Sequence, residues 1–294
     1  TADPSDWGDA DDPNRVPLAD GIPRWVLYNV IVFPFNVVEK TLAMLDRHAE
    51  RLACGGLDPV PHRVGLVPAT HEFVEAIYAW TRRNKSLLVF DEVVTFRVAY
   101  GGAQQAYRVQ PDMTAMGKII GGGFPVGALA GRADVMKVLD PREPLLRFPH
   151  SGTFSANPIT MTAGYTAMKL FDRKAVTQLN QLTDQAIGQI REVIALAGVP
   201  VSVTGSGSMF RIHLRSNPPV TYREAYQDKE SSALINTLLD YMYNEEQILM
   251  INTFACMFST ALTRTETDIL SEALLRAFRK MKPQIESLPV NKKV

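Results

Sequence analysis

A lysine and an acid stand at the ends of two predicted strands. Asp91 follows the apolar run at 87–90, and Lys118 comes just after a short predicted strand at 113–116. Ligands of parallel sheets bind beyond the carboxyl ends of the strands, so we expect both side chains to face one crevice. A pyridoxal-phosphate enzyme needs these two groups. Its lysine forms a Schiff base with the cofactor aldehyde, and its carboxylate pairs with the protonated pyridine nitrogen.

The neighbours of both residues bear on this interpretation. Lysines are mostly solvated surface charges, but Lys118 stands between Gly117 and the apolar Ile119. We expect its ammonium to lose solvation there, which would make the amine available for imine formation. We expect Asp91 to be a buried carboxylate. The alternative is that it only caps a turn at the strand end.

Other candidates have weaker support. Val93 would point to the same side as Asp91 and could pack on a cofactor ring or belong to the core. The hydroxyl-rich stretch 150–158 precedes a predicted helix start, which suits either a phosphate site or an ordinary capped loop. Arg63 and Arg211 are candidate carboxylate clamps for a substrate, because arginine binds carboxylates in a bidentate way.

The composition narrows the class of protein. The 294 residues are 46% hydrophobic and carry no net charge, so no basic surplus predicts nucleic acid or an anionic membrane as partner. No apolar stretch approaches membrane-spanning length. The five histidines lack metal-ligand spacing, so we expect no metal. Cys54 and Cys256 are isolated in apolar contexts. We predict that they are reduced core thiols, which favours the cytoplasm.

The order of predicted elements indicates an α/β fold with a mostly parallel sheet, followed by a smaller α+β lobe. We divide the chain into an acidic loop segment at 1–25, a large domain at 26–180 and a small domain at 181–294. The abrupt, acidic start suggests that sequence is missing upstream. The predicted strands are 26–33, 52–57, 87–91, 113–116, 199–204, 209–214 and 248–258. The predicted helices are 36–51, opened by Asn36 and Glu39, then 70–84, 157–171, 173–196, 231–245 and 265–280, with Pro283 stopping the last.

Several stretches resemble class III pyridoxal-phosphate aminotransferases, on the branch of glutamate-1-semialdehyde aminomutase and β-amino-acid aminotransferases. They are LLVFDEVVTFR (87–97), PDMTAMGKIIGGGFPVGALAGR (111–132), HSGTFSANPITMTAGY (150–165) and GSGSMF (205–210). The resemblance implies fold type I of the pyridoxal-phosphate transferases. It also implies that Lys118 is the Schiff-base lysine, Asp91 the pyridinium partner and Val93 a ring-face contact. Thr153 would bind the cofactor phosphate held by the other subunit, which requires a homodimer with active sites at its interface.

The chain also departs from this family. Roughly a third of the usual chain, at the N-terminal side, has no counterpart, and the usual Glu-Pro after the preceding strand is Asp58-Pro59. The leading hypothesis is an aminotransferase that moves an amino group between an amino acid or amine and a keto acid, with ping-pong kinetics. An aminomutase is one alternative. The other is a non-catalytic truncated or split half that binds a partner chain.

Overall fold

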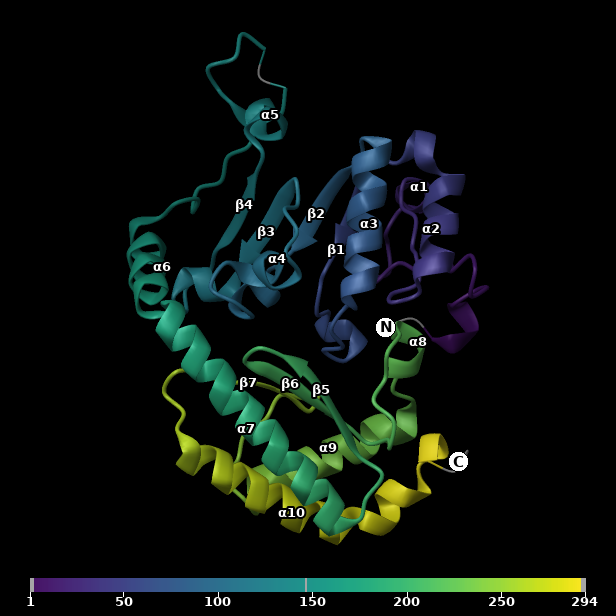
Figure 1. Ribbon diagram of the computed structural model, residues 1–294, viewed down its shortest axis with the longest axis vertical. Helices are drawn as coiled ribbons and strands as arrows, with labels where there is room; N and C mark the ends of the chain where they lie inside the picture. The colour runs from purple at the N-terminus through teal and green to yellow at the C-terminus, as the bar shows by residue number, and fades with distance from the viewer. Residues whose placement is uncertain (1–2, 146, 292–294) are drawn as a thin grey trace.

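The larger lobe is built on a four-stranded sheet in the order β1-β2-β3-β4. The computed structural model describes residues 3–145 and 147–291. Strands β1 (Cys54–Leu57), β2 (Leu87–Asp91) and β3 (Met113–Gly117) are parallel, as expected, while β4 (Gly127–Gly131) is an antiparallel edge strand that the sequence patterns did not predict. Because β1 to β3 run in one direction, their carboxyl ends meet at one edge of the sheet, which faces the smaller lobe (Figure 1).

Helix α3 (His71–Asn84) covers one face of this sheet and packs its buried Phe73 and Ile77 on Leu88 and Phe90. Thr70 caps α3 as predicted, because its hydroxyl accepts a hydrogen bond from the backbone N–H of Phe73. Helix α2 (Val38–Arg47) lies beside α3. The other helices of the lobe are α1 (Arg24–Tyr28), α4 (Gly102–Tyr107), α5 (Ala133–Met136) and α6 (Pro158–Leu170).

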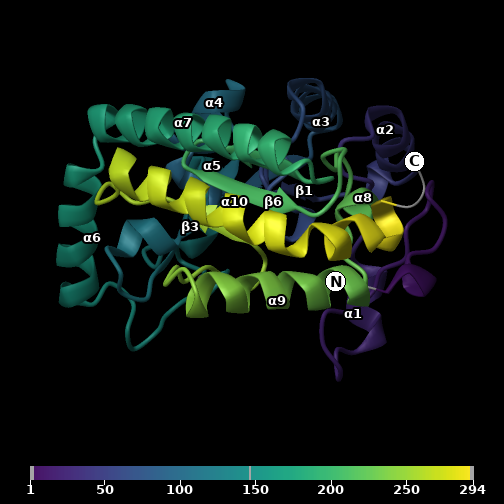
Figure 2. The same ribbon diagram turned by 90° about the horizontal axis from the view of Figure 1, so that it is seen from below.

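The smaller lobe has a three-stranded antiparallel sheet in the order β5-β6-β7. Its strands are β5 (Ser202–Ser206), β6 (Met209–His213) and β7 (Ala255–Met257), and its helices are α7 (Arg173–Ala197), α8 (Tyr222–Ala225), α9 (Lys229–Asn244) and α10 (Arg264–Ser287). Helix α10 lies between α7 and α9 (Figure 2), and the three bury one apolar core against the sheet. This is the α+β arrangement expected for the second lobe.

Strand β6 is buried on both faces. Phe210 and Ile212 enter the core of the smaller lobe, whereas Met209 joins a cluster with Val60 and Leu66 of the larger lobe. His213, on the same face as Met209, lies within 3.2 Å of the carbonyl oxygen of Gly65. One face of β6 therefore forms the contact between the lobes.

Some local predictions are wrong. The apolar stretch 26–33 is no buried strand; α1 occupies its start and none of its residues is fully buried. Asn36 has a φ of 61° and caps no helix, because its side chain binds the backbone N–H of Thr70 and the carbonyl of Pro68. Pro283 lies inside α10, which continues because Ile285 beyond it is buried. The domain boundary at residue 180 stays a prediction.

The cysteine prediction is half wrong. Cys54 is exposed at the start of β1 and is no core thiol. Cys256 is partly buried in β7, and burial raises the pKa of its thiol to about 12. Both are free thiols. Among residues 3–145 and 147–291, no helix is long and apolar enough to cross a membrane.

Candidate active site

The acids and the lysine lie together at the carboxyl edge of the large sheet. Leu57 of β1 pairs with Phe90 of β2, so Asp58 and Asp91 follow at the same level of adjacent strands. The pKa of Asp58 is raised to about 7, first by burial and then by the negative charges of Asp91 and Glu92, while the positive charge of Lys118 lowers it. Asp91 and Lys118 are thus both within electrostatic range of one side chain.

Lys118 directly follows β3 and has a left-handed backbone, with φ of 50°. A residue with a β-carbon pays roughly 1–2 kcal/mol for this conformation. Its side chain is exposed and lines a pocket of about 560 Å³ together with Val93, Phe124 and Met257. The prediction that its ammonium would be desolvated is therefore wrong for this chain, because the pocket is open to solvent.

Asp91 is exposed as well, so the prediction of a buried carboxylate is wrong. It is the last residue of β2 and does not line the Lys118 pocket, and one carboxylate oxygen accepts a hydrogen bond from the backbone N–H of Val93 at 3.1 Å. The turn-capping alternative is correct for that oxygen. The second oxygen has no hydrogen-bond partner among the described residues and is free to pair with a cation.

Glu92 takes the opposite direction. It is fully buried and accepts hydrogen bonds from the backbone N–H groups of Ala103 and Gln104 in the first turn of α4. Burial raises the pKa of this carboxyl. Glu92 therefore anchors α4, and of the two adjacent acids only Asp91 is exposed.

The structure does not bring the remaining candidates to this pocket. Arg211 is 5% exposed and donates a hydrogen bond to the carbonyl of His62 at 3.4 Å, and burial lowers the pKa of its guanidinium to about 10. Arg63 is exposed and lines a different pocket, formed with the N-terminal segment and Tyr222. Thr153 lies in an exposed loop before α6. The roles of Arg63, Arg211 and Thr153 stay predictions.

Three residues near the site were missed in the sequence. His62 lies in the loop after β1, where burial and then the charges of Arg211, Arg63 and Lys118 lower its pKa. Arg97 and Met257 line the pocket of Lys118. Arg97 stands in the quoted stretch 87–97, which could have drawn attention to it. No local pattern in the sequence singles out Met257.

The residues present fit pyridoxal phosphate. The free oxygen of Asp91 can pair with a protonated pyridine nitrogen, the amine of Lys118 is accessible to an aldehyde, and Val93 offers an apolar wall. A lysine and a carboxylate at adjacent strand ends of an α/β lobe are the pair of groups that a pyridoxal-phosphate enzyme uses. Residues 34–240 match the model of the class III aminotransferase family, and the chain belongs to this family.

Known proteins of similar sequence and structure agree with this family assignment. Glutamate-1-semialdehyde 2,1-aminomutase of Desulforudis audaxviator is 35% identical over 267 residues, which cover 90% of this chain and 61% of that protein. An omega-transaminase from Sphaerobacter thermophilus is 39% identical, with a TM-score of 0.89, and the match covers 92% of this chain and 62% of that one. A transaminase solved with pyridoxal phosphate bound is 32% identical, with a TM-score of 0.83 over 95% of this chain and 64% of that one.

These comparisons confirm the expected family and the α/β fold of type I pyridoxal-phosphate enzymes. They also give the extent of the match. The chain spans a little over three fifths of the length of each of these three relatives.

Proposed function

We propose that this chain carries the lysine-bearing part of a class III aminotransferase, which moves an amino group between an amino acid or amine and a keto acid. The strongest support is that Asp91 and Lys118 lie at the ends of the adjacent parallel strands β2 and β3. Both are close enough to Asp58 for their charges to shift its pKa. Bound pyridoxal phosphate supplies an aldehyde for covalent attachment and an electron-withdrawing ring.

The protein's own groups have separate tasks in this proposal. The free oxygen of Asp91 holds the proton on the pyridine nitrogen and orients the ring. Val93 supports the ring face. The amine of Lys118 would hold the cofactor and, when free, would move a proton at the substrate carbon. Because the amino group leaves with one substrate and returns to another, the kinetics are ping-pong.

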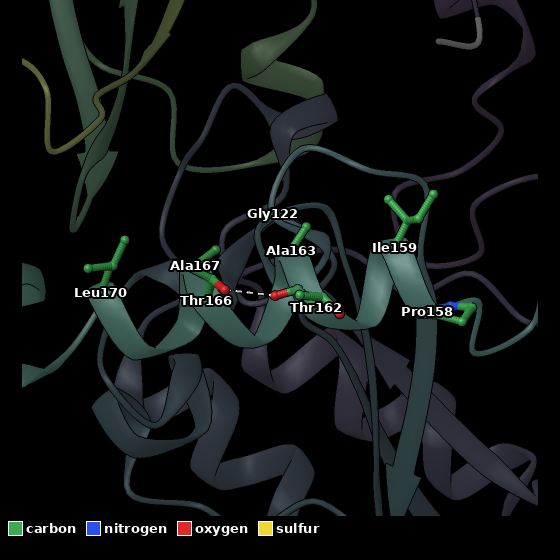
Figure 3. Close-up of a pocket in the computed structure, with 8 residues that line it drawn as sticks. All are labelled: Gly122, Pro158, Ile159, Thr162, Ala163, Thr166, Ala167 and Leu170. Carbon is green, nitrogen blue, oxygen red and sulfur yellow. Dashed lines mark hydrogen bonds between the residues drawn. The ribbon is translucent and has the colours of Figure 1, made fainter.

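A homodimer in the cytoplasm is part of the proposal. Thr153 lies in an exposed loop, and in this proposal it binds the cofactor phosphate of another subunit. The neighbouring α6 presents an apolar groove of about 700 Å³, in which Ile159 and Leu170 are 66% and 73% exposed (Figure 3). Apolar patches of this kind mark interaction sites. The two free cysteines favour a reducing compartment.

The test is covalent trapping. Purified protein is incubated with pyridoxal phosphate, reduced with borohydride and digested, and the modified peptides are identified by mass spectrometry. We expect a yellow protein whose absorbance band borohydride bleaches, with the label on Lys118. Lys118→Ala should remain colourless, and Lys174→Ala, at an exposed position on α7, is the matched control. Label distributed over surface lysines would contradict the proposal.

An aminomutase is the second candidate, supported by the name of the curated relative. The two activities differ in their need for an acceptor. Conversion of an amino donor without any added keto acid would favour the mutase, whereas an absolute requirement for the acceptor favours the transaminase.

The third hypothesis is a non-catalytic half that binds a partner chain. Two observations support it. Lys118 and Asp91 are exposed, and the chain covers only 61% of the aminomutase relative. A preparation that stays colourless with added cofactor alone, and becomes yellow only when another chain is added, would favour this hypothesis.

A further inference from the structure

One wall of the Lys118 pocket comes from the smaller lobe. Most of the lining residues belong to the turns after β2 and β3, but Met257 comes from the end of β7. Its side chain is 37% exposed and therefore stands at the accessible side of the pocket. Methionine is unbranched and adapts its shape to neighbouring groups. A methionine here therefore limits the size of the group that can approach Lys118, but does so flexibly.

Arg97 fastens this wall to the larger lobe. Its Nε donates to the hydroxyl of Ser208 at 2.8 Å, and its Nη2 donates to the carbonyl oxygen of Phe258. Phe258 directly follows Met257, and Ser208 directly precedes Met209, the residue paired with Met257 across the sheet. Both acceptors of Arg97 therefore flank Met257. The backbone N–H of Phe258 also binds the carbonyl of Ser208 at 3.0 Å, which joins the two acceptors.

The surroundings make this contact rigid. Ser208 is fully buried and Phe258 is 5% exposed. Asn180 of α7 donates to the carbonyl of Val98, the residue after Arg97, at 2.9 Å. A β-carbon on Gly207 would lie 2.9 Å from the Cα of Val98, so the backbones of the two lobes touch at this point. Such close contact leaves β7 little freedom to move relative to the lysine.

We propose that Met257 determines the size of the group that can approach Lys118, and that Arg97 is the positioning residue that holds Met257 there. As an assignment of substrate selection, this inference rests on the proposed function of Lys118. The expected consequence is a limit on the bulk of the amino substrate, set by a residue of the smaller lobe.

The test uses aldehydes of two sizes on the full chain without cofactor. Formaldehyde or 2-naphthaldehyde condenses with the amine of Lys118, water leaves, and cyanoborohydride reduces the resulting double bond to a stable amine. Peptide mass spectrometry gives the ratio of naphthyl to methyl label on Lys118. We expect Met257→Trp to lower this ratio at least five-fold and Met257→Ala to raise it about three-fold. Leu249→Trp, on an 82% exposed side chain that does not line the pocket, should leave it unchanged.

The arginine is tested through its coupling to Met257. In an Arg97→Lys background, Met257→Trp should lower the ratio less than two-fold, because β7 is no longer held at the pocket. Ser208→Ala is a second route to the same loss if the arginine variant folds poorly. An unchanged ratio in both Met257 variants would overturn the assignment of Met257, and a full effect of Met257→Trp in the Arg97→Lys and Ser208→Ala backgrounds would overturn that of Arg97. Failure of the proposed function would instead appear as absence of cofactor on Lys118, which this ratio does not measure.

Discussion

Asp91 and Glu92, two neighbouring acids at the end of β2, have different roles because one is exposed and the other is buried. Glu92 is buried and accepts hydrogen bonds from the first turn of α4, whereas Asp91 is exposed and has one oxygen without a hydrogen-bond partner among the described residues. Alternation along a strand predicts this division. Only the acid that stays free can serve a ligand.

Asp91→Asn should weaken binding of pyridoxal phosphate. The amide cannot stabilise a positive charge on the pyridine nitrogen, and a hydrogen bond to a charged group contributes about 1.5–3 kcal/mol. We therefore expect an affinity roughly ten- to a hundred-fold lower, measured by isothermal titration with the cofactor. Asp184→Asn, on an exposed part of α7, is the control. Equal affinity of the wild type and the Asp91 variant would contradict a pyridinium partner at this position.

Asp58 should make folding stability depend on pH. Its pKa is about 7 in the folded chain against an ordinary value of 3.8, so its contribution to stability is full below about pH 4 and is lost as the pH rises through 7. Asp58→Asn removes this loss. We expect the stability of the variant relative to the wild type to grow by about 1–3 kcal/mol between pH 5 and pH 8, measured by denaturant unfolding.

The comparison must be made between variants, because His213 acts in the other direction. Burial lowers its pKa to about 3, so it removes stability as the pH falls below its ordinary value of 6.5. This contribution is the same in both proteins and cancels in the difference. A stability difference that does not change between pH 5 and pH 8 would contradict the assignment to Asp58.

At the scale of elements, the loop after β1 packs closely against β6. Gly65 has a φ of 76°, and a β-carbon there would lie 2.6 Å from Cε1 of His213. His213 cannot withdraw easily, because its Nε2 lies 2.7 Å from the hydroxyl of Thr204. This contact ties the larger lobe to the smaller one.

Gly65→Ala should therefore destabilise the protein by about 1–3 kcal/mol, through backbone strain and through the clash. The measurement is thermal unfolding at pH 7. Gly55→Ala in β1 is a matched control, since a β-carbon there meets nothing within 4 Å. An equal melting temperature for the two variants would contradict the predicted strain and clash at Gly65.

At this scale, the sequence predicts features that depend on neighbouring residues better than contacts between residues far apart in the chain. The strand ends at Asp91 and Lys118 follow from local apolar runs and from the rule for parallel sheets. The contact of Arg97 with Phe258 joins residues 161 positions apart and depends on how the lobes dock. The stretch 26–33 was misjudged because its composition is that of a strand, while no neighbouring strand pairs with it among the described residues.

For the whole molecule, the groove on α6 gives the sharpest prediction. If two copies meet there, Ile159→Glu and Leu170→Glu should each weaken the dimer at least ten-fold, because a charge would be buried in an apolar contact. Analytical ultracentrifugation across protein concentrations measures this. Leu196→Glu, an equally exposed leucine on α7, is the control. A wild-type chain that sediments as a monomer at all concentrations would contradict a dimer through α6.

The outer side of β4 has a further consequence. All five of its residues are exposed, and among the described strands only β3 pairs with it, so a row of backbone donors and acceptors faces solvent. Edges of this kind recruit extended segments of other molecules, and natural proteins commonly protect them with charges or prolines. The sequence GALAG has neither. Concentrated solutions of this chain should therefore tend to associate through this edge, and a lysine introduced at Leu129 should increase its solubility.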